Sequence, residues 1–139
     1  MVTLHQVKEL KTLKKFLPYF DIPLQHISSP VLKRMGRFYD EKYIIQFIDQ
    51  IKKIFPIRFI RTNLIIGFPG ETKEDFEKLV KFVDDIKFDN IALFEYHDEP
   101  LAASSKLPNK VDDHKIRTRF TKLRQLVNRQ LLDHEQARK

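Results

Sequence analysis

The sequence contains no cysteine and no tryptophan, and it has only three glycines in 139 residues. Without cysteine, the chain forms no disulfide and offers no thiolate to a metal ion or to a nucleophilic mechanism. No apolar run approaches the roughly 20 residues that a helix needs to cross a bilayer, and the charged start MVTLHQVKELKTLKK is not typical of a signal peptide. These absences favour a cytoplasmic protein.

Charge is spread unevenly along a chain that is long enough for one domain, with 42% hydrophobic residues and twelve phenylalanines to form a core. Residues 1–39 carry seven Lys or Arg against two acidic residues, residues 40–105 nine against thirteen, and residues 106–139 ten against four, for a net charge of +7. The basic last segment indicates a surface that faces nucleic acid or the ribosome. An ordinary solvated helix face is the alternative, because no RNA-binding motif accompanies the charge.

Helix-like and strand-like segments alternate along this single domain, residues 1–139, and the last helix falls in the basic segment 112–139. Apolar residues recur every three or four positions in the helices, and β-branched or apolar runs form the strands. The predicted strands cover residues 19–24, 57–66 and 90–96. The predicted helices cover residues 4–17, 30–35, 41–55, 73–86 and 112–136, with caps at Ser29, Asp40 and the pair Thr72 and Asp75.

Alternating strands and helices are typical of parallel βα units. The right-handed crossover places the carboxyl end of every strand at one edge of the sheet, where ligands bind in βα architectures. Polar or glycine-rich residues follow each predicted strand: Gln25 and His26, then residues 67–71 (GFPGE), then residues 95–99 (EYHDE). The pattern therefore predicts an α/β fold with a ligand site at this edge.

Each of these segments also has a purely structural interpretation. His26 is as consistent with a hydrogen bond to the adjoining helix as with ligand binding, and GFPGE with a connector whose glycines supply unusual dihedrals. GFPGE is not a phosphate-binding P-loop, because no Lys-Ser or Lys-Thr follows its second glycine. Asp21 is expected to pair with Arg58 or Arg61. The adjacent polar residues 97–99 rarely converge on one metal ion in proteins, so no metal is expected there.

Three segments together carry a resemblance to a known family: YFDIPLQHISSPVLKRMGR, IRTNLIIGFPGETKEDFEKLVKFVDDIKFDNIALFEY and LPNKVDDHKIRTRFTKLRQLVNRQ. Over roughly residues 18–130 the chain resembles the radical S-adenosylmethionine methylthiotransferases. DIPLQH resembles their ribosomal-protein (RimO-type) branch, whereas the tRNA-modifying branch typically has QSGS at that place. The resemblance implies a partial TIM-like barrel of six βα units, of which this chain would supply the last three and the long final helix.

Parts of the family pattern are absent from this sequence. The family holds a four-iron, four-sulfur cluster on a CxxxCxxC loop, carries a second cluster in an earlier domain, and ends in a small β-barrel, the TRAM domain. Without cysteine the chain has no thiolates for a cluster, so the chain alone is expected to be inactive. The third strand also ends in EYHDEPLAAS, where the family tends to have YSxExGTxA.

The resemblance places part of the S-adenosylmethionine site at the ends of the three strands. The glycines of GFPGE would allow backbone to approach the adenine, and Phe68 would pack on it. Because the cluster that anchors the cofactor is missing, binding is expected to be weak. Position by position, the resemblance nominates Gln25, His26, Arg61, Gly67, Phe68, Pro69, Gly70 and Tyr96.

Two main functions follow from the resemblance. The first is a fragment of an aspartate methylthiotransferase that modifies a small-subunit ribosomal protein, with a missing amino-terminal half as its partner. The alternative is a free-standing, non-catalytic binding module that docks on the ribosome, on RNA or on that half through its basic last helix. A small unrelated βα enzyme is a third interpretation.

A three-stranded piece of a barrel leaves two sheet edges and one sheet face uncovered. Ile22, Ile65 and Phe94 are expected on that face, and apolar patches of this kind usually mark a partner surface. The expected outcome is a homodimer or capture of the missing half. In the competing outcome, the first or last helix folds over the face and the chain stays monomeric.

Overall fold

The computed structural model describes residues 18–98 and 103–138, so the predicted helix over residues 4–17 lies outside the described residues. The other predicted elements are present. In chain order they are β1 (Tyr19–Asp21), α2 (Ser29–Arg34), α3 (Glu41–Ile54), β2 (Phe59–Ile66), α4 (Lys73–Ile86), β3 (Asn90–Glu95), the short 3-10 helix η1 (Ala103–Lys106) and α5 (Asp113–Arg138).

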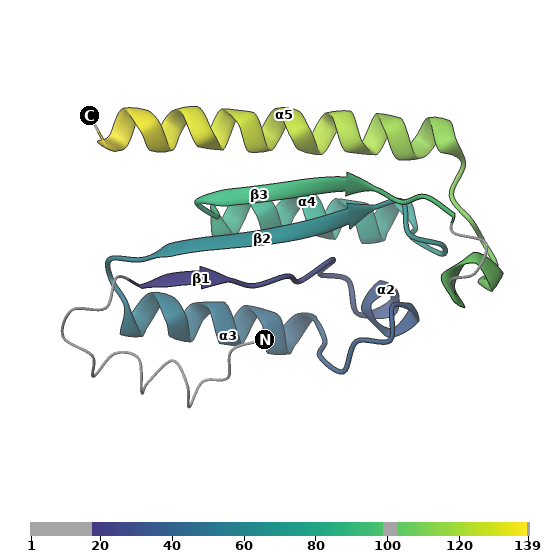
Figure 1. Ribbon diagram of the computed structural model, residues 1–139, viewed down its shortest axis with the longest axis horizontal. Helices are drawn as coiled ribbons and strands as arrows, with labels where there is room; N and C mark the ends of the chain where they lie inside the picture. Colours follow the sequence, from purple (N-terminus) through teal and green to yellow (C-terminus); the bar gives the residue numbers. More distant parts are fainter. Residues whose placement is uncertain (1–17, 99–102, 139) are drawn as a thin grey trace.

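The three strands form one sheet in the order β1-β2-β3, and both neighbouring pairs are parallel. Asp21 pairs with Arg61 across the first interface, and Ile65 pairs with Phe94 across the second. Figure 1 shows α5 running alongside β3 for the length of the sheet. The predicted α/β fold of three parallel βα units ending in a long helix is therefore confirmed.

The two faces of the sheet differ in burial, because successive side chains of a strand point to opposite faces. Residues at even positions of β2, such as Ile60 and Leu64, are buried in a core shared with α3 and α4. Residues at odd positions remain partly exposed. We call this second side the open face, and its residues from the three strands are Tyr19, Asp21, Phe59, Arg61, Asn63, Ile65, Asn90, Ala92 and Phe94.

The prediction for the open face is confirmed at Ile65 and Phe94, which are register partners there. It is wrong at Ile22, which is fully buried in the core. Ile22 directly follows Asp21, an open-face residue, so strand alternation turns its side chain toward the helices. An apolar strand residue in the sequence does not by itself reveal which face it occupies.

Strand β1 ends three residues earlier than predicted. Pro23 has no N–H to contribute to a ladder, and Gln25 has a positive φ of 72°. The hydroxyl of Thr62 pairs the backbone groups just beyond the end of β1. It donates to the carbonyl of Ile22 at 2.6 Å and accepts from the amide of Leu24 at 3.3 Å. An isolated bridge between Gln25 and Leu64 then restores the parallel pairing.

Helix caps follow the sequence prediction with one shift. The Asp40 side chain accepts from the amide of Tyr43, and Thr72 and Asp75 form a reciprocal capping box. The predicted cap at Ser29 is wrong by one residue, because Ser28 occupies the cap position. The Ser28 hydroxyl makes no capping bond; it donates to Asp75 of α4 instead.

Gly67 is a position where substitution tests the close packing of the strand–helix turn. It has φ +85°, and a Cβ there would lie 2.3 Å from Cγ1 of Ile116. Gly36 has a similar φ of +77° with nothing within 4 Å of the added atom. We expect Gly36→Ala to cost about 1–2 kcal/mol, the penalty of the left-handed region. Gly67→Ala should cost at least about 1 kcal/mol more, because it also overpacks the core.

Urea unfolding of the two variants measures this difference. Equal losses of unfolding free energy in Gly67→Ala and Gly36→Ala would show that the Ile116 side chain can move away from the added methyl group at no cost in stability. That result would contradict the close packing at the turn.

Candidate functional site

The carboxyl edge of the sheet brings together the ends of all three strands, as predicted. Gln25 bridges to Leu64 of β2, Gly67 directly follows β2, and the amide of Tyr96 donates to the carbonyl of Ile66 at 2.9 Å. Gln25, Gly67 and Tyr96 therefore lie on one rim. This rim and the adjoining open face form the candidate site.

Beneath the rim lies a buried network centred on the carboxylate of Glu71. Its Oε2 bonds to Nε2 of His26 at 2.9 Å and accepts from the amide of Gly67 at 3.2 Å. Its Oε1 accepts from Arg119 of α5 at 2.8 Å. The side chains of both Glu71 and His26 are fully buried. The network thus joins the end of β1, the GFPGE turn and the start of α5.

The hydrogen bonds of His26 define its tautomer. Its Nδ1 accepts from the amide of Ser28 at 3.0 Å, so this nitrogen carries no proton. The neutral ring must then carry its proton on Nε2 and donate to Glu71. Both ring nitrogens of His26 are therefore engaged within the chain, and its position supports the structural interpretation of this residue.

Asp75 extends the polar interior into α4. Burial by itself would raise the pKa of its carboxyl group. Hydrogen bonds from the Ser28 hydroxyl and from Thr72 outweigh this effect and lower the pKa below its ordinary value. The charged form is thus stabilised at neutral pH, and the bond from Ser28 ties the segment before α2 to α4.

The two glycines of the GFPGE turn pack against this chain's own side chains. The bare face of Gly67 meets Ile116 of α5, and that of Gly70 meets the guanidinium of Arg34, 2.6 Å from an added Cβ. The amide of Gly70 donates to the carbonyl of Asn109 at 2.7 Å. Side chains of this chain therefore fill the space on the Cβ side of both glycines, and the predicted approach of their backbone to adenine stays a prediction.

Two aromatic rings of the predicted site are in contact at the rim. The rings of Phe68 and Tyr96 meet edge to face with centroids 5.3 Å apart, and Phe68 is buried. The Tyr96 hydroxyl lies 2.9 Å from Asp98 and 3.1 Å from Ser104. Desolvation by its surroundings, reinforced by Asp98, raises the pKa of Tyr96. The phenol is therefore neutral and held in place. Pro69, which follows Phe68 and is also a predicted site residue, is buried as well.

Asp98 has an ion pair that fixes the segment after β3. Lys110 donates to its carboxylate at 2.9 Å and, with Tyr96, lowers the pKa of Asp98. From the sequence, no metal is expected at residues 97–99. Among the residues that the structure describes, no group of three or more His, Asp or Glu side chains is placed to hold a metal ion.

Arg61 lies apart from the other predicted site residues. It precedes Gly67 by six positions on an extended strand, roughly 20 Å from the rim. Its guanidinium bonds to Asn90 at 3.2 Å and lies 3.5 Å from Asp21. Arg61 is thus the predicted partner of Asp21, and the pair is on the open face rather than at the rim.

Asn63 is a residue that the sequence analysis missed. It lies on the open face between Arg61 and Ile65, and its Oδ1 is buried without a hydrogen-bond partner among the described residues. A buried polar atom without a partner costs free energy and commonly marks a ligand position. The available signal was the alternation of Arg61 and Asn63 with apolar residues along β2.

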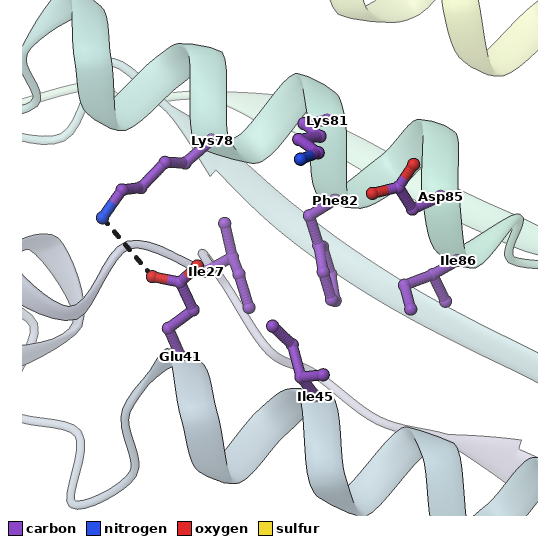
Figure 2. A pocket seen from close by; sticks show the side chains of 8 residues that line it. All are labelled: Ile27, Glu41, Ile45, Lys78, Lys81, Phe82, Asp85 and Ile86. Atoms are coloured by element: carbon purple, nitrogen blue, oxygen red, sulfur yellow. Dashed lines mark hydrogen bonds and ion pairs between the residues drawn. The ribbon is translucent and has the colours of Figure 1, made fainter.

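A hollow in the described structure lies on the other side of the sheet. Figure 2 shows it between α3 and α4, where Ile27, Ile45 and Phe82 form apolar walls. Its volume is about 280 Å³. The Glu41–Lys78 ion pair, 3.4 Å long, crosses one end. None of the predicted site residues lines this hollow.

Comparison with known proteins matches these features to one family. The Radical SAM superfamily profile matches residues 1–83 of this 139-residue chain. The chain belongs to the radical SAM superfamily. In the described residues, the fold is that of three of its parallel βα units.

Curated relatives share the name "Ribosomal protein uS12 methylthiotransferase RimO". The protein from Fervidobacterium nodosum is 49% identical over 98 residues, covering 70% of this chain and 23% of its own. That from Geobacter sulfurreducens is 36% identical over 137 residues, covering 94% of this chain and 31% of its own. The chain therefore spans between about a quarter and a third of the length of these relatives.

A solved structure supports the fold independently of close sequence identity. Coproporphyrinogen III oxidase (HemN) from Escherichia coli, described as a radical SAM enzyme, superposes with a TM-score of 0.74. The match covers 93% of this chain and 30% of HemN at 18% identity. In the described part of the chain, no helix is long and apolar enough to span a membrane.

The central role of Glu71 gives a testable expectation for stability. Replacing Glu71 by Ala leaves Arg119, which is 14% exposed, without its buried counter-ion. Breaking a buried pair in this way typically costs about 3–5 kcal/mol. Glu41→Ala is the matched control, because it removes an ion pair to Lys78 in which both side chains are substantially exposed, and it should cost under about 1 kcal/mol.

Chemical denaturation of both variants at neutral pH provides the comparison. If Glu71→Ala proves no more destabilising than Glu41→Ala, the buried network does not hold the edge together.

Proposed function

We propose that this chain forms the S-adenosylmethionine-binding part of a radical SAM methylthiotransferase that acts on a ribosomal protein. The reaction and the substrate class come from the name that these relatives share. The observation that carries the cofactor assignment is the unpartnered Oδ1 of Asn63 on an open sheet face that leads to the rim. The chain by itself is then a partial, catalytically silent unit.

The open face and the rim suit the chemistry of this cofactor. S-adenosylmethionine has an aromatic base, a ribose and an amino-acid end, and so needs apolar, donor and acceptor groups in one groove. Ile65 and Phe94 offer apolar surface beside Asn63, and Tyr96 with Gln25 provides polar groups at the rim. Arg61 supplies a cation further along the same face.

The iron–sulfur cluster does not fit this chain. Such clusters are held by cysteine thiolates, and the sequence has none. No step of the reaction is therefore assigned to residues of this chain. In the proposal, the cluster ligands come from another part of the barrel, and these strand ends bind and orient the cofactor.

Cofactor binding by the chain alone tests the proposal. In an NMR titration with S-adenosylmethionine, we expect weak binding, with shifts confined to the open face and the rim. Asn63→Leu should weaken binding about three- to tenfold, because the acceptor for one hydrogen bond is lost. Asn128→Leu is the control, because Asn128 is an exposed residue of α5 away from the open face, and it should leave binding unchanged.

Two results would contradict the cofactor assignment: shifts that map to the hollow between α3 and α4, or equal binding by wild type and Asn63→Leu. Micromolar affinity in the absence of a cluster would contradict the partial nature of the site.

We also propose that the open face takes a second copy of the chain when the remainder of the barrel is absent. Tyr19 and Phe94, one on each edge strand, are 50% and 52% exposed there. Helix α5 packs against β3 and α4 and leaves Phe94 uncovered, which argues against the competing outcome in which this helix closes the face. Burial of exposed apolar surface would drive the association.

Sedimentation equilibrium tests this association, with a homodimer as the expected species. Phe94→Asp should weaken the dimer at least about tenfold, since it places a charge in an apolar contact. Phe38→Asp is the control, because Phe38 is 84% exposed beside α3, away from the open face. A monomer throughout the high micromolar range, or equal effects of the two substitutions, would refute the proposal.

A further inference from the structure

The solvent side of α5 carries a set of cations that the cofactor site does not use. We infer that this side is a docking surface for the phosphate backbone of RNA. We call it the basic surface of α5, and it consists of five exposed residues: Lys115, Arg117, Lys122, Arg124 and Arg129.

Helical geometry arranges these cations in two rows. Lys115, Lys122 and Arg129 follow one another at seven-residue spacing, so they recur about every 10.5 Å along one line of the helix. Arg117 and Arg124 have the same spacing on the opposite flank. Neutral polar residues separate the rows, namely Thr118, Thr121, Gln125 and Asn128, all of them exposed. A strip edged by positive charge on both sides matches a polyanionic strand.

The charges of this surface are not neutralised within the described structure. Residues 114–132 contain six Lys or Arg and no acidic residue. Of these six, Arg119 is bound to the buried Glu71, whereas none of the five surface cations forms an ion pair with another described residue. Arg124 lies 5.9 Å from the ring centre of Phe120 and stays exposed. Five positive charges therefore remain for an external anion.

The apolar stripe of α5 argues against a membrane as the partner. Its large apolar residues Ile116, Leu123 and Val127 are buried against the rest of the domain. A helix that binds a lipid surface needs such residues free to enter the bilayer. Leu132, 60% exposed, is the exception among the described residues of α5. Because the basic surface of α5 offers charge but little exposed apolar area, an RNA backbone is favoured over a lipid surface as its partner.

The spread of the charges also argues against an acidic peptide. Peptide recognition usually combines a groove with apolar anchors, whereas Ile116, Leu123 and Val127 of α5 are buried in the domain. Backbone phosphates require only regularly spaced cations. The choice of RNA over DNA rests on the proposed function, because a ribosomal protein substrate is surrounded by RNA.

The location of the surface suits such a role. Figure 1 shows α5 running alongside the sheet, with its first turns at the carboxyl ends of the strands. Arg119 of α5 is itself part of the network beneath the rim. An RNA strand held along α5 would therefore pass beside the candidate site, and binding there would orient a ribosomal substrate toward it.

Fluorescence anisotropy with a labelled 20-nucleotide single-stranded RNA tests the inference on the full 139-residue chain. Five phosphate contacts predict a slope of about −3.5 for log K against log salt, hence a loss of roughly 100-fold between 50 and 200 mM KCl. The variant K115Q/K122Q/R129Q should bind at least tenfold more weakly at 50 mM KCl, with a slope smaller by about 2.

The variant K42Q/K73Q/K81Q is the matched control. It removes the same charge from exposed lysines of α3 and α4, and it should keep the wild-type slope. Circular dichroism verifies that both triple variants are folded.

Several outcomes would overturn the inference: equal losses in the two triple variants, DNA of the same length bound at least tenfold more tightly than RNA, displacement of RNA by polyglutamate at equal charge, or preferential binding to phosphatidylserine vesicles. The cofactor titration reports separately on the proposed function. If the wild-type chain binds no RNA but still shows the NMR shifts with S-adenosylmethionine, this inference is rejected and the proposed function is not.

Discussion

The arrangement of the carboxyl edge depends on one buried carboxylate. An unpaired charge in a protein interior is strongly unfavourable, so Glu71 requires its three partners at once. They come from distant parts of the chain: His26 after β1, the amide of Gly67 after β2, and Arg119 in α5. Satisfying Glu71 therefore ties the segment after β1, the GFPGE turn and the second turn of α5 to one another.

His26 and the two glycines of the GFPGE turn also have contacts within the chain. The ring of His26 is locked by bonds at both nitrogens, and the bare faces of Gly67 and Gly70 are filled by Ile116 and Arg34. Contacts within the chain alone therefore hold these residues of the edge in place. Preorganisation of this kind supports binding residues that lie next to it. In the proposed function, those binding residues are on the open face.

The molecule thus separates its roles by surface. One face of the sheet and helices α3 and α4 make the core, while the opposite face offers polar and apolar groups around Asn63. The basic surface of α5 is a third surface, and it faces solvent. In the two proposals, the open face holds a cofactor inside a barrel, and the basic surface of α5 holds an RNA-bound substrate outside it.

The sequence alone determined the order of the elements, the parallel sheet and the rim. Apolar periodicity and caps are local signals, and the crossover rule places parallel strand ends together, so Gln25, Gly67 and Tyr96 could be assigned to one edge. Only the tertiary structure decided which face each strand residue occupies and which polar groups are already paired. Register placed Ile22 in the core and Arg61 away from the rim, and burial left Asn63 without a partner. These outcomes depend on contacts between residues some forty positions apart, which no local pattern encodes.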